Sequence, residues 1–402
     1  MRQETAPAGT GTDPKLTFLW PIMLASLGFG FLWFALPIFG KRLGASALEI
    51  GALFSVFTLV TVLLRPLVGR ALDRFGRKWF FVAGLACYAA AMATFAAVSS
   101  LGTLYIARII QGIGASLLWL SAYTIATDRM PTEERGHAVG RVDEALARGA
   151  LVGAFLGFAL LSFLPGDQGW RWVFLVYAVA AALGAWQALV KTPETRPLKA
   201  APGKRSELNL RALLRLMAIV FLAGISTAMI TPLLLIFLQD KFTTDIATLA
   251  WAYVPAAVVA SFLPSRLGRI SDRFGRVAPM ALGMVVSGAV SLLMPNLASM
   301  VWLVILWVVE AIGAAAAAPA QEAMVADLTG GDERGTGYGF FTFAASLGAV
   351  IGPLVGGWLY DNTGHAAPFY LNGLILFVAA GLAVLLLRRP RLPAAAPTLR
   401  EN

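Results

Sequence analysis

The chain has 402 residues, of which 58% are hydrophobic and 13% are charged, and its formal net charge is +10. So much apolar surface cannot be buried in the core of a soluble protein of this length, which excludes an ordinary soluble enzyme and places the chain in a lipid bilayer. The single cysteine, Cys87, excludes a disulfide framework, and the two histidines have no acidic or sulfur partner at metal-ligand spacing, so no metal and no other cofactor is expected.

Twelve apolar stretches follow one another along the chain, each long enough to cross about 30 Å of hydrocarbon as a helix. They cover residues 17–39, 47–66, 79–99, 102–127, 137–163, 170–190, 211–238, 247–265, 277–295, 299–325, 338–360 and 367–387. Residues 191–210 are the only long polar interruption, and we expect them to link two six-helix bundles on the cytoplasmic side. The sequence therefore predicts an all-α integral membrane protein with cytoplasmic tails at 1–16 and 388–402 and bundles at 17–190 and 211–387.

The distribution of basic residues indicates how these helices are oriented. With both ends in the cytoplasm, 26 of the 32 Lys and Arg residues lie on the cytoplasmic side, as the positive-inside rule requires. Basic loops that face anionic lipids account for the net charge, so no nucleic-acid partner is expected. We predict a monomeric, multi-pass protein of the bacterial cytoplasmic membrane whose partners are lipids, protons and a small-molecule substrate.

A duplicated motif shows that one unit is used twice. Residues 69–77 (GRALDRFGR) and 268–276 (GRISDRFGR) match at seven of nine positions and lie 199 residues apart, the offset that also separates Asp128 from Asp327. Because six helices are an even number, the second half enters the membrane with the same polarity as the first. Parallel repeats of this kind place the substrate site of a transporter between the two halves.

Several of these motifs identify a family. Residues 69–78 (GRALDRFGRK), 108–114 (RIIQGIG), 169–174 (GWRWVF) and 193–195 (PET) together make the chain similar to the major facilitator superfamily, specifically its twelve-helix drug/proton antiporter branch. Exporters of that branch carry a GxxxGPxxGG pattern. The stretch 348–357 has it in full, and the stretch 149–158 lacks the proline and the last glycine. The pattern predicts close helix packing at four glycines and one proline: Gly149, Gly153, Gly348, Gly352 and Pro353.

The resemblance also implies a charged latch on the cytoplasmic side. In the family an aspartate, an arginine and a second acidic residue close that side when the transporter opens outward, and Gly69 lets two backbones approach closely. Carried over by position, the latch is Asp73, Arg77 and Asp128, with a second copy at Asp272, Arg276 and Asp327. The alternative is that these charges only set the topology.

Four ionisable side chains fall inside the apolar stretches, namely Arg108, Glu144, Arg148 and Glu310. Each costs roughly 2.5 to 3.5 kcal/mol at the bilayer centre, so they must pair or face water. Arg108 precedes Asp128 by 20 residues and Glu310 precedes Asp327 by 17, so the two lie at a similar depth and we hypothesise that they pair across a cavity. An alternative for Arg108 is snorkelling to the outer interface.

Glu144 lies one helical turn before Arg148, a spacing that predicts an intrahelical pair with either a structural role or a role in binding. A carboxyl group in hydrocarbon favours its protonated form, and one beside a guanidinium favours its charged form. A glutamate that alternates between these surroundings carries a proton, and our candidates are Glu310 and Glu144, with Arg108 as the switch partner and Gln111 beside it.

The side chains available for substrate binding are mostly apolar, with few amides within the spans. Aromatic candidates for the cavity are Trp33, Trp119, Tyr123 and Trp307. We expect proton-coupled efflux of hydrophobic or amphiphilic small molecules. Two alternatives stay open: uptake of a small organic anion held by Arg108 and Arg148, and a non-transporting membrane sensor or lipid-binding protein on the same fold.

Overall fold

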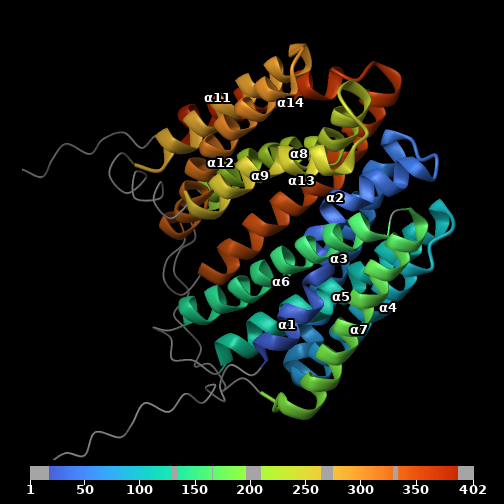
Figure 1. The fold of residues 1–402 in the computed structure, drawn as a ribbon. Coiled ribbons are helices and arrows are strands. Elements are labelled where there is room, and N and C mark those ends of the chain that lie inside the picture. The colour runs from blue at the N-terminus through green and yellow to red at the C-terminus, as the bar shows by residue number, and fades with distance from the viewer. Residues whose placement is uncertain are drawn as a thin grey trace, which may run out of the picture. The chain divides into compact units, whose positions relative to one another are not determined.

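The computed structural model describes residues 18–128, 135–164, 166–195, 210–263, 275–328 and 334–387. Within these ranges every regular element is a helix and there is no strand, which confirms the all-α prediction (Figure 1). Eleven of the described spans are long and apolar enough to cross a membrane. The predicted span at 247–265 begins as α9 (Ile246–Phe262), an apolar helix of 17 residues.

The chain forms two compact units. Unit 1 comprises Met1–Ala45 and Val56–Ala201, and unit 2 comprises Ser46–Ser55 and Pro202–Asn402. Unit 1 contains α1 (Leu19–Ala25), α2 (Leu27–Arg42), most of α3 (Ala47–Phe75), α4 (Lys78–Ala96), α5 (Leu101–Asp128), α6 (Arg135–Phe163) and α7 (Asp167–Lys191). Unit 2 contains the start of α3, α8 (Leu210–Lys241), α9, α11 (Val277–Leu293), the short 3₁₀ turn η3 (Met294–Asn296), α12 (Met300–Leu328), α13 (Arg334–Asn362) and α14 (Ala367–Leu387).

The sequence repeat has a direct structural counterpart. Helices α3, α5 and α6 begin at residues 47, 101 and 135, and α9, α12 and α13 begin 199 residues later at 246, 300 and 334. Helices α6 and α13 also end 199 residues apart, at Phe163 and Asn362. The same local signals thus start corresponding helices in both halves of the chain.

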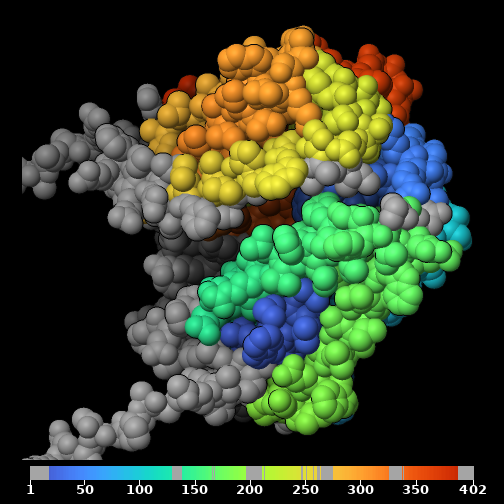
Figure 2. All heavy atoms as spheres, in the orientation of Figure 1, coloured from blue at the N-terminus to red at the C-terminus, as the bar shows by residue number. Residues whose placement is uncertain are grey.

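Aromatic side chains hold the core of unit 1 together. The ring of Phe39 stacks on Trp170 with 3.7 Å between centroids, and Trp170 Nε1 donates to the backbone oxygen of Phe95 at 2.9 Å. Phe31 and Phe174 are fully buried and in contact, with ring centroids 5.8 Å apart. In Figure 2, α6 and α7 cover the visible face of unit 1, with α1 in blue between them. The GWRWVF motif therefore anchors α7 to the core.

The core of unit 2 is aliphatic, with a polar chain at its centre. Its buried side chains include Leu216, Ile219, Met280, Met284, Met324 and Leu376. Ser226 Oγ on α8 donates to the side-chain oxygen Oδ1 of Asn372 on α14, and Asn372 Nδ2 donates to Ser291 Oγ on α11 at 2.8 Å. Because all three side chains are buried and hydrogen-bonded, this chain fixes the relative rotation of three apolar helices.

Glycines let helices pack backbone to backbone at equivalent places in the two units. A Cβ atom added at Gly153 on α6 would collide with the backbone oxygen of Leu27 on α2. At the equivalent Gly352 on α13, an added Cβ would collide with Ile225 O and lie 2.9 Å from Met229 N, both on α8. One turn earlier, a Cβ added at Gly149 would meet Met23 O on α1, and one added at Gly348 would meet Phe221 O on α8.

We predict that Gly153→Ala and Gly352→Ala each lower the free energy of unfolding by about 1 to 3 kcal/mol, because the added methyl group meets backbone that cannot move aside cheaply. The measurement is thermal unfolding of the purified protein in detergent. Gly140 on α6 and Gly339 on α13 are matched controls, since nothing lies within 4 Å of a Cβ added at either position. Equal melting temperatures for Gly153→Ala and Gly140→Ala would contradict this account of the packing.

Candidate functional site

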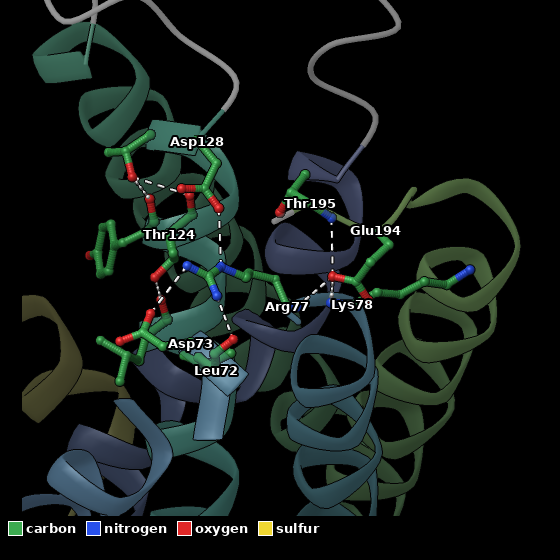
Figure 3. Close-up of polar contacts among 11 residues, drawn as sticks. Leu72, Asp73, Arg77, Lys78, Thr124, Asp128, Glu194 and Thr195 are labelled. Atoms are coloured by element: carbon green, nitrogen blue, oxygen red, sulfur yellow. Dashed lines mark hydrogen bonds and ion pairs between the residues drawn. The ribbon is translucent and has the colours of Figure 1, made fainter. Parts of the chain in front are cut away.

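The charged network expected after α3 is present in unit 1 (Figure 3). Arg77 lies between α3 and α4, directly before the first residue of α4, and only 2% of it is exposed. Its Nε donates to Asp128 Oδ2 at the end of α5 at 3.0 Å, and its Nη2 donates to Asp73 Oδ1 at 3.3 Å. Its Nη1 donates to the backbone oxygen of Leu72. One buried guanidinium thus joins the ends of α3 and α5, which the planar fork of an arginine suits better than a lysine would.

A glycine and a distant glutamate shape the turn that carries Arg77. Gly76 has φ +95°, a left-handed conformation that side chains other than glycine rarely adopt. A Cβ at Gly76 would also lie 2.6 Å from Glu194 Oε1. That oxygen accepts hydrogen bonds from the backbone N–H groups of Arg77 at 2.5 Å and Lys78 at 3.3 Å, at the start of α4. Glu194, in the PET motif after α7, therefore caps α4 from 117 residues away.

We predict that Glu194→Ala lowers the free energy of unfolding by about 1 kcal/mol, the usual cost of losing a helix cap. Glu194→Gln keeps one acceptor oxygen and is expected to cost less. Thermal unfolding of the two variants beside the parent protein checks both the size and the order of the effects. A melting temperature that is the same in all three would show that the cap contributes nothing.

The remaining residues of the predicted latch are Gly69 and the second copy of the motif. Among the described residues, a Cβ at Gly69 would meet only Leu120 Cδ2, at an ordinary 3.7 Å, so the close backbone approach expected there is not found. In the second copy, Asp272 and the side chain of Asp327 lie outside the described residues. Arg276 immediately precedes α11, as Arg77 precedes α4.

Arg108 on α5 is buried within unit 1. It is 5% exposed, its Nη1 donates to Gln111 Oε1 at 2.7 Å, and its Cζ lies 4.4 Å from the centre of the Phe57 ring on α3. Both contacts hold the guanidinium inside the unit, which argues against snorkelling to the outer interface. Trp119 is one of the expected cavity aromatics and lies on the same helix, where its Nε1 donates to Tyr88 Oη on α4 at 3.1 Å.

A second polar group links α5 to α6. The Tyr123 hydroxyl donates to Asp143 Oδ1 at 2.5 Å, although the sequence offered no reason to join these two residues. One turn further along α6, Arg148 donates to Glu144, so the intrahelical pair expected from the spacing is present. The side chains of Arg148 and Glu144 are 66% and 43% exposed, so they are not buried within unit 1.

In unit 2, Glu310 occupies the middle of the apolar helix α12. It is half-buried, and no described residue of unit 2 makes a hydrogen bond or an ion pair with it. One turn earlier on the same helix, the ring of Trp307 packs edge-on against Tyr253 of α9, with 4.2 Å between centroids. Trp33, the remaining aromatic candidate, is 47% exposed and contacts Phe29 in unit 1.

These features define a class of protein. Two membrane-embedded bundles related by an internal repeat, with ionisable groups within apolar helices, are the architecture of a secondary transporter. The sequence model of the Major Facilitator Superfamily matches residues 21–217 and again 216–402, so the chain belongs to that superfamily and is a multi-pass membrane transporter rather than an enzyme.

Relatives with names and solved structures agree with this assignment. The chain is 23% identical over 370 residues to multidrug resistance protein 1 of Bacillus subtilis, covering 90% of this chain and 93% of that one. It is 26% identical to the class G tetracycline resistance protein of Vibrio anguillarum, covering 91% and 95%. A crystal structure of a bacterial homolog of the human lysosomal transporter Spinster superimposes with a TM-score of 0.77 at 17% identity, covering 94% and 97%, which shows a shared fold.

Proposed function

We propose that this transporter exports hydrophobic or amphiphilic small molecules in exchange for protons. The observation that carries the proposal is Glu310, a carboxyl group within an apolar helix to which no described residue of its own unit bonds. A charged group at that depth is costly, so an ionisable residue there is most simply explained by function. The multidrug and tetracycline resistance proteins that match over nine-tenths of the chain support export as the direction.

In the proposed cycle the two halves of the chain rock about the substrate and expose it to each side in turn. The Arg77 network closes the cytoplasmic side in one state and opens in the other. Arg108 is the switch partner of Glu310. A proton leaves the carboxyl group when the guanidinium approaches and returns when it withdraws, and Glu144 on α6 is a second proton candidate. The electrical part of the proton gradient supplies about 2.3 kcal/mol per charge for each 100 mV.

The proposed substrate class follows from the residue types that we expect to line the cavity. Trp33, Trp119, Tyr123 and Trp307 give large, adaptable apolar contacts, whereas amide side chains suited to a polyhydroxylated solute are scarce within the spans. The proposal includes a cytoplasmic-membrane location with both ends of the chain in the cytoplasm and a monomeric transporter. A tag at either end that is accessible only from the cytoplasm would agree with this topology.

The test is transport by purified protein in proteoliposomes with an imposed pH gradient. Gradient-driven movement of a lipophilic dye, abolished by a protonophore, is the expected result. Uptake of a small organic anion without dye movement would overturn the proposed substrate class. Absence of transport for both classes, in protein that melts cooperatively, would favour a sensor or lipid-binding role instead.

A further inference from the structure

The beginning of α3 is built differently from its counterpart in the repeat. Residues Ser46–Ser55 belong to unit 2, although the rest of α3 from Val56 belongs to unit 1. The first turn of a helix leaves backbone N–H groups without partners inside the helix. Two of these groups in α3 are satisfied locally, because Ser46 Oγ accepts from Glu49 N at 3.2 Å and Glu49 Oε2 accepts from Ser46 N at 2.8 Å. This is a capping box.

The two N–H groups between them are satisfied from a different helix. Asp361, near the end of α13, accepts from Ala47 N at 3.0 Å with Oδ1 and from Leu48 N at 2.8 Å with Oδ2. Both carboxylate oxygens are therefore used, and the negative charge lies at the positive end of the α3 dipole. The local capping box leaves these two N–H groups unsatisfied, so the start of α3 depends on a residue of α13 for two of its hydrogen bonds.

Two glycines bring the helices close enough for this contact. A Cβ added at Gly357 on α13 would lie 2.5 Å from Leu48 Cα and 2.6 Å from Ala47 O, and one added at Gly51 on α3 would collide with Pro353 O. Tyr360, the residue before Asp361, is also held in place. Its hydroxyl donates to Asp240 Oδ2 on α8 at 2.7 Å, and its ring stacks on His365. Asp361 is thus presented from a rigid helix end.

The repeat provides an internal comparison. The positions 199 residues from Ser46, Glu49 and Asp361 are Asp245, Thr248 and Ser162. Asp245 Oδ2 caps its own helix α9 by accepting from Thr248 N at 2.9 Å, and Ser162 Oγ donates to Phe158 O within its own helix. Phe158 also stands where Gly357 would have its counterpart. The residue that matches Asp361 is thus a serine bonded within its own helix, whereas Asp361 accepts two bonds from the start of α3.

We propose that Asp361 is an extracellular latch, which holds the start of α3 against α13 and must release it when the transporter opens to the outside. This inference rests on the proposed alternating-access function and on the topology in which α3 begins on the extracellular side. The contact is suited to this role because water can replace both partners when they separate. Water then donates to the carboxylate and accepts from the two N–H groups. The cytoplasmic Arg77 network and the extracellular Asp361 cap then close opposite sides of the membrane in different states.

The test uses spin labels on the extracellular side of each unit, at Gly102→Cys and Thr363→Cys in a Cys87→Ala background, and measures their distance distribution. Both label sites are exposed, and nothing but Ser100 Oγ at 3.8 Å lies near a Cβ at Gly102. Asp361→Ala is expected to increase the population with the longer, outward-open distance by about fivefold, the equivalent of one lost cap. Asp361→Asn keeps one acceptor oxygen and is expected to give a smaller increase.

Asp245→Ala is the control for the loss of a helix cap, since it removes the oxygen that accepts from Thr248 N at the start of α9, and it is expected to leave the distribution unchanged. Gly357→Ala pushes α3 and α13 apart while the carboxylate is kept, and it is expected to act like Asp361→Ala. Its control is Gly381→Ala on α14, which is expected to have no effect because nothing lies within 4 Å of the added Cβ. A parental distribution in both Asp361→Ala and Gly357→Ala overturns the latch. The labels need no substrate, so absent transport with a shifted distribution overturns only the proposed function.

Discussion

Replacing Arg77 with alanine is expected to lower the rate of substrate transport by about tenfold or more while the protein still inserts and folds. The side chain is 2% exposed and serves Asp128, Asp73 and the Leu72 carbonyl together. Removing one member of a buried charge pair costs about 3 to 5 kcal/mol, although Asp73, with 75% of its side chain exposed, contributes little of this. In the proposed cycle the network forms only when the cytoplasmic side is closed, so the variant destabilises that state alone. A bias of about 1.4 kcal/mol already changes the equilibrium between the two states tenfold.

The measurement is the initial rate of dye transport, with thermal unfolding as a check on folding. Arg77→Lys keeps the charge but not the planar fork, so its rate is expected to lie between those of the parent and Arg77→Ala. Arg70→Ala removes an exposed arginine from the same helix end, where no described residue bonds to it, and is expected to transport normally. If Arg70→Ala and Arg77→Ala transport equally well, the charges at this end serve topology and the latch interpretation fails.

The Arg77 network also shows how much a short motif predicts. The spacing GRALDRFGR placed Asp73 and Arg77 around the end of a helix, and Gly76 supplies the left-handed turn that ends it. The 199-residue offset of the sequence repeat is likewise the offset between the starts of three pairs of helices. These features are local, because they depend on backbone preferences and on residues within one turn of each other, and a sequence displays such neighbours directly.

Contacts between distant segments were missed for a physical reason. Glu194 caps α4 from 117 residues away, and Asp361 lies 313 residues from Leu48, so no spacing along the chain connects them. In a soluble helix the apolar face identifies the side that packs. In the bilayer the lipid-facing side is apolar as well, and the sequence therefore cannot show which face of α3 or α13 meets a neighbour.

The first span illustrates a smaller departure with a local cause. Residues 17–39 were predicted as one helix, whereas the structure has α1 and α2 on either side of Ser26. The Ser26 hydroxyl donates to Ile22 O at 2.7 Å, one turn back, a bond that bends helices and loosens the regular ladder. A lone serine in an apolar run is too common for such a break to be predicted.

Glu310→Gln is expected to abolish transport driven by a pH gradient while leaving substrate binding largely intact. Glutamine has the same size but carries no exchangeable charge, so the packing beside Trp307 and Tyr253 is retained and the proton step is lost. The two measurements are gradient-driven dye efflux in proteoliposomes and the rise in melting temperature on adding dye. Glu322→Gln, an exposed glutamate nearer the end of the same helix, is the matched control and is expected to transport at the parental rate.

Arg108 allows the partner of Glu310 to be tested as well. Its guanidinium already has Gln111 and the Phe57 ring inside unit 1, so Arg108→Ala is expected to reduce stability as well as transport. The combination of Arg108→Glu with Glu310→Arg preserves a pair of opposite charges. Partial recovery of transport relative to either single variant is the expected result, because the pair then needs only opposite charge at matched depth. A double variant no better than the worse single variant would leave Glu310 as a proton site with some partner other than Arg108.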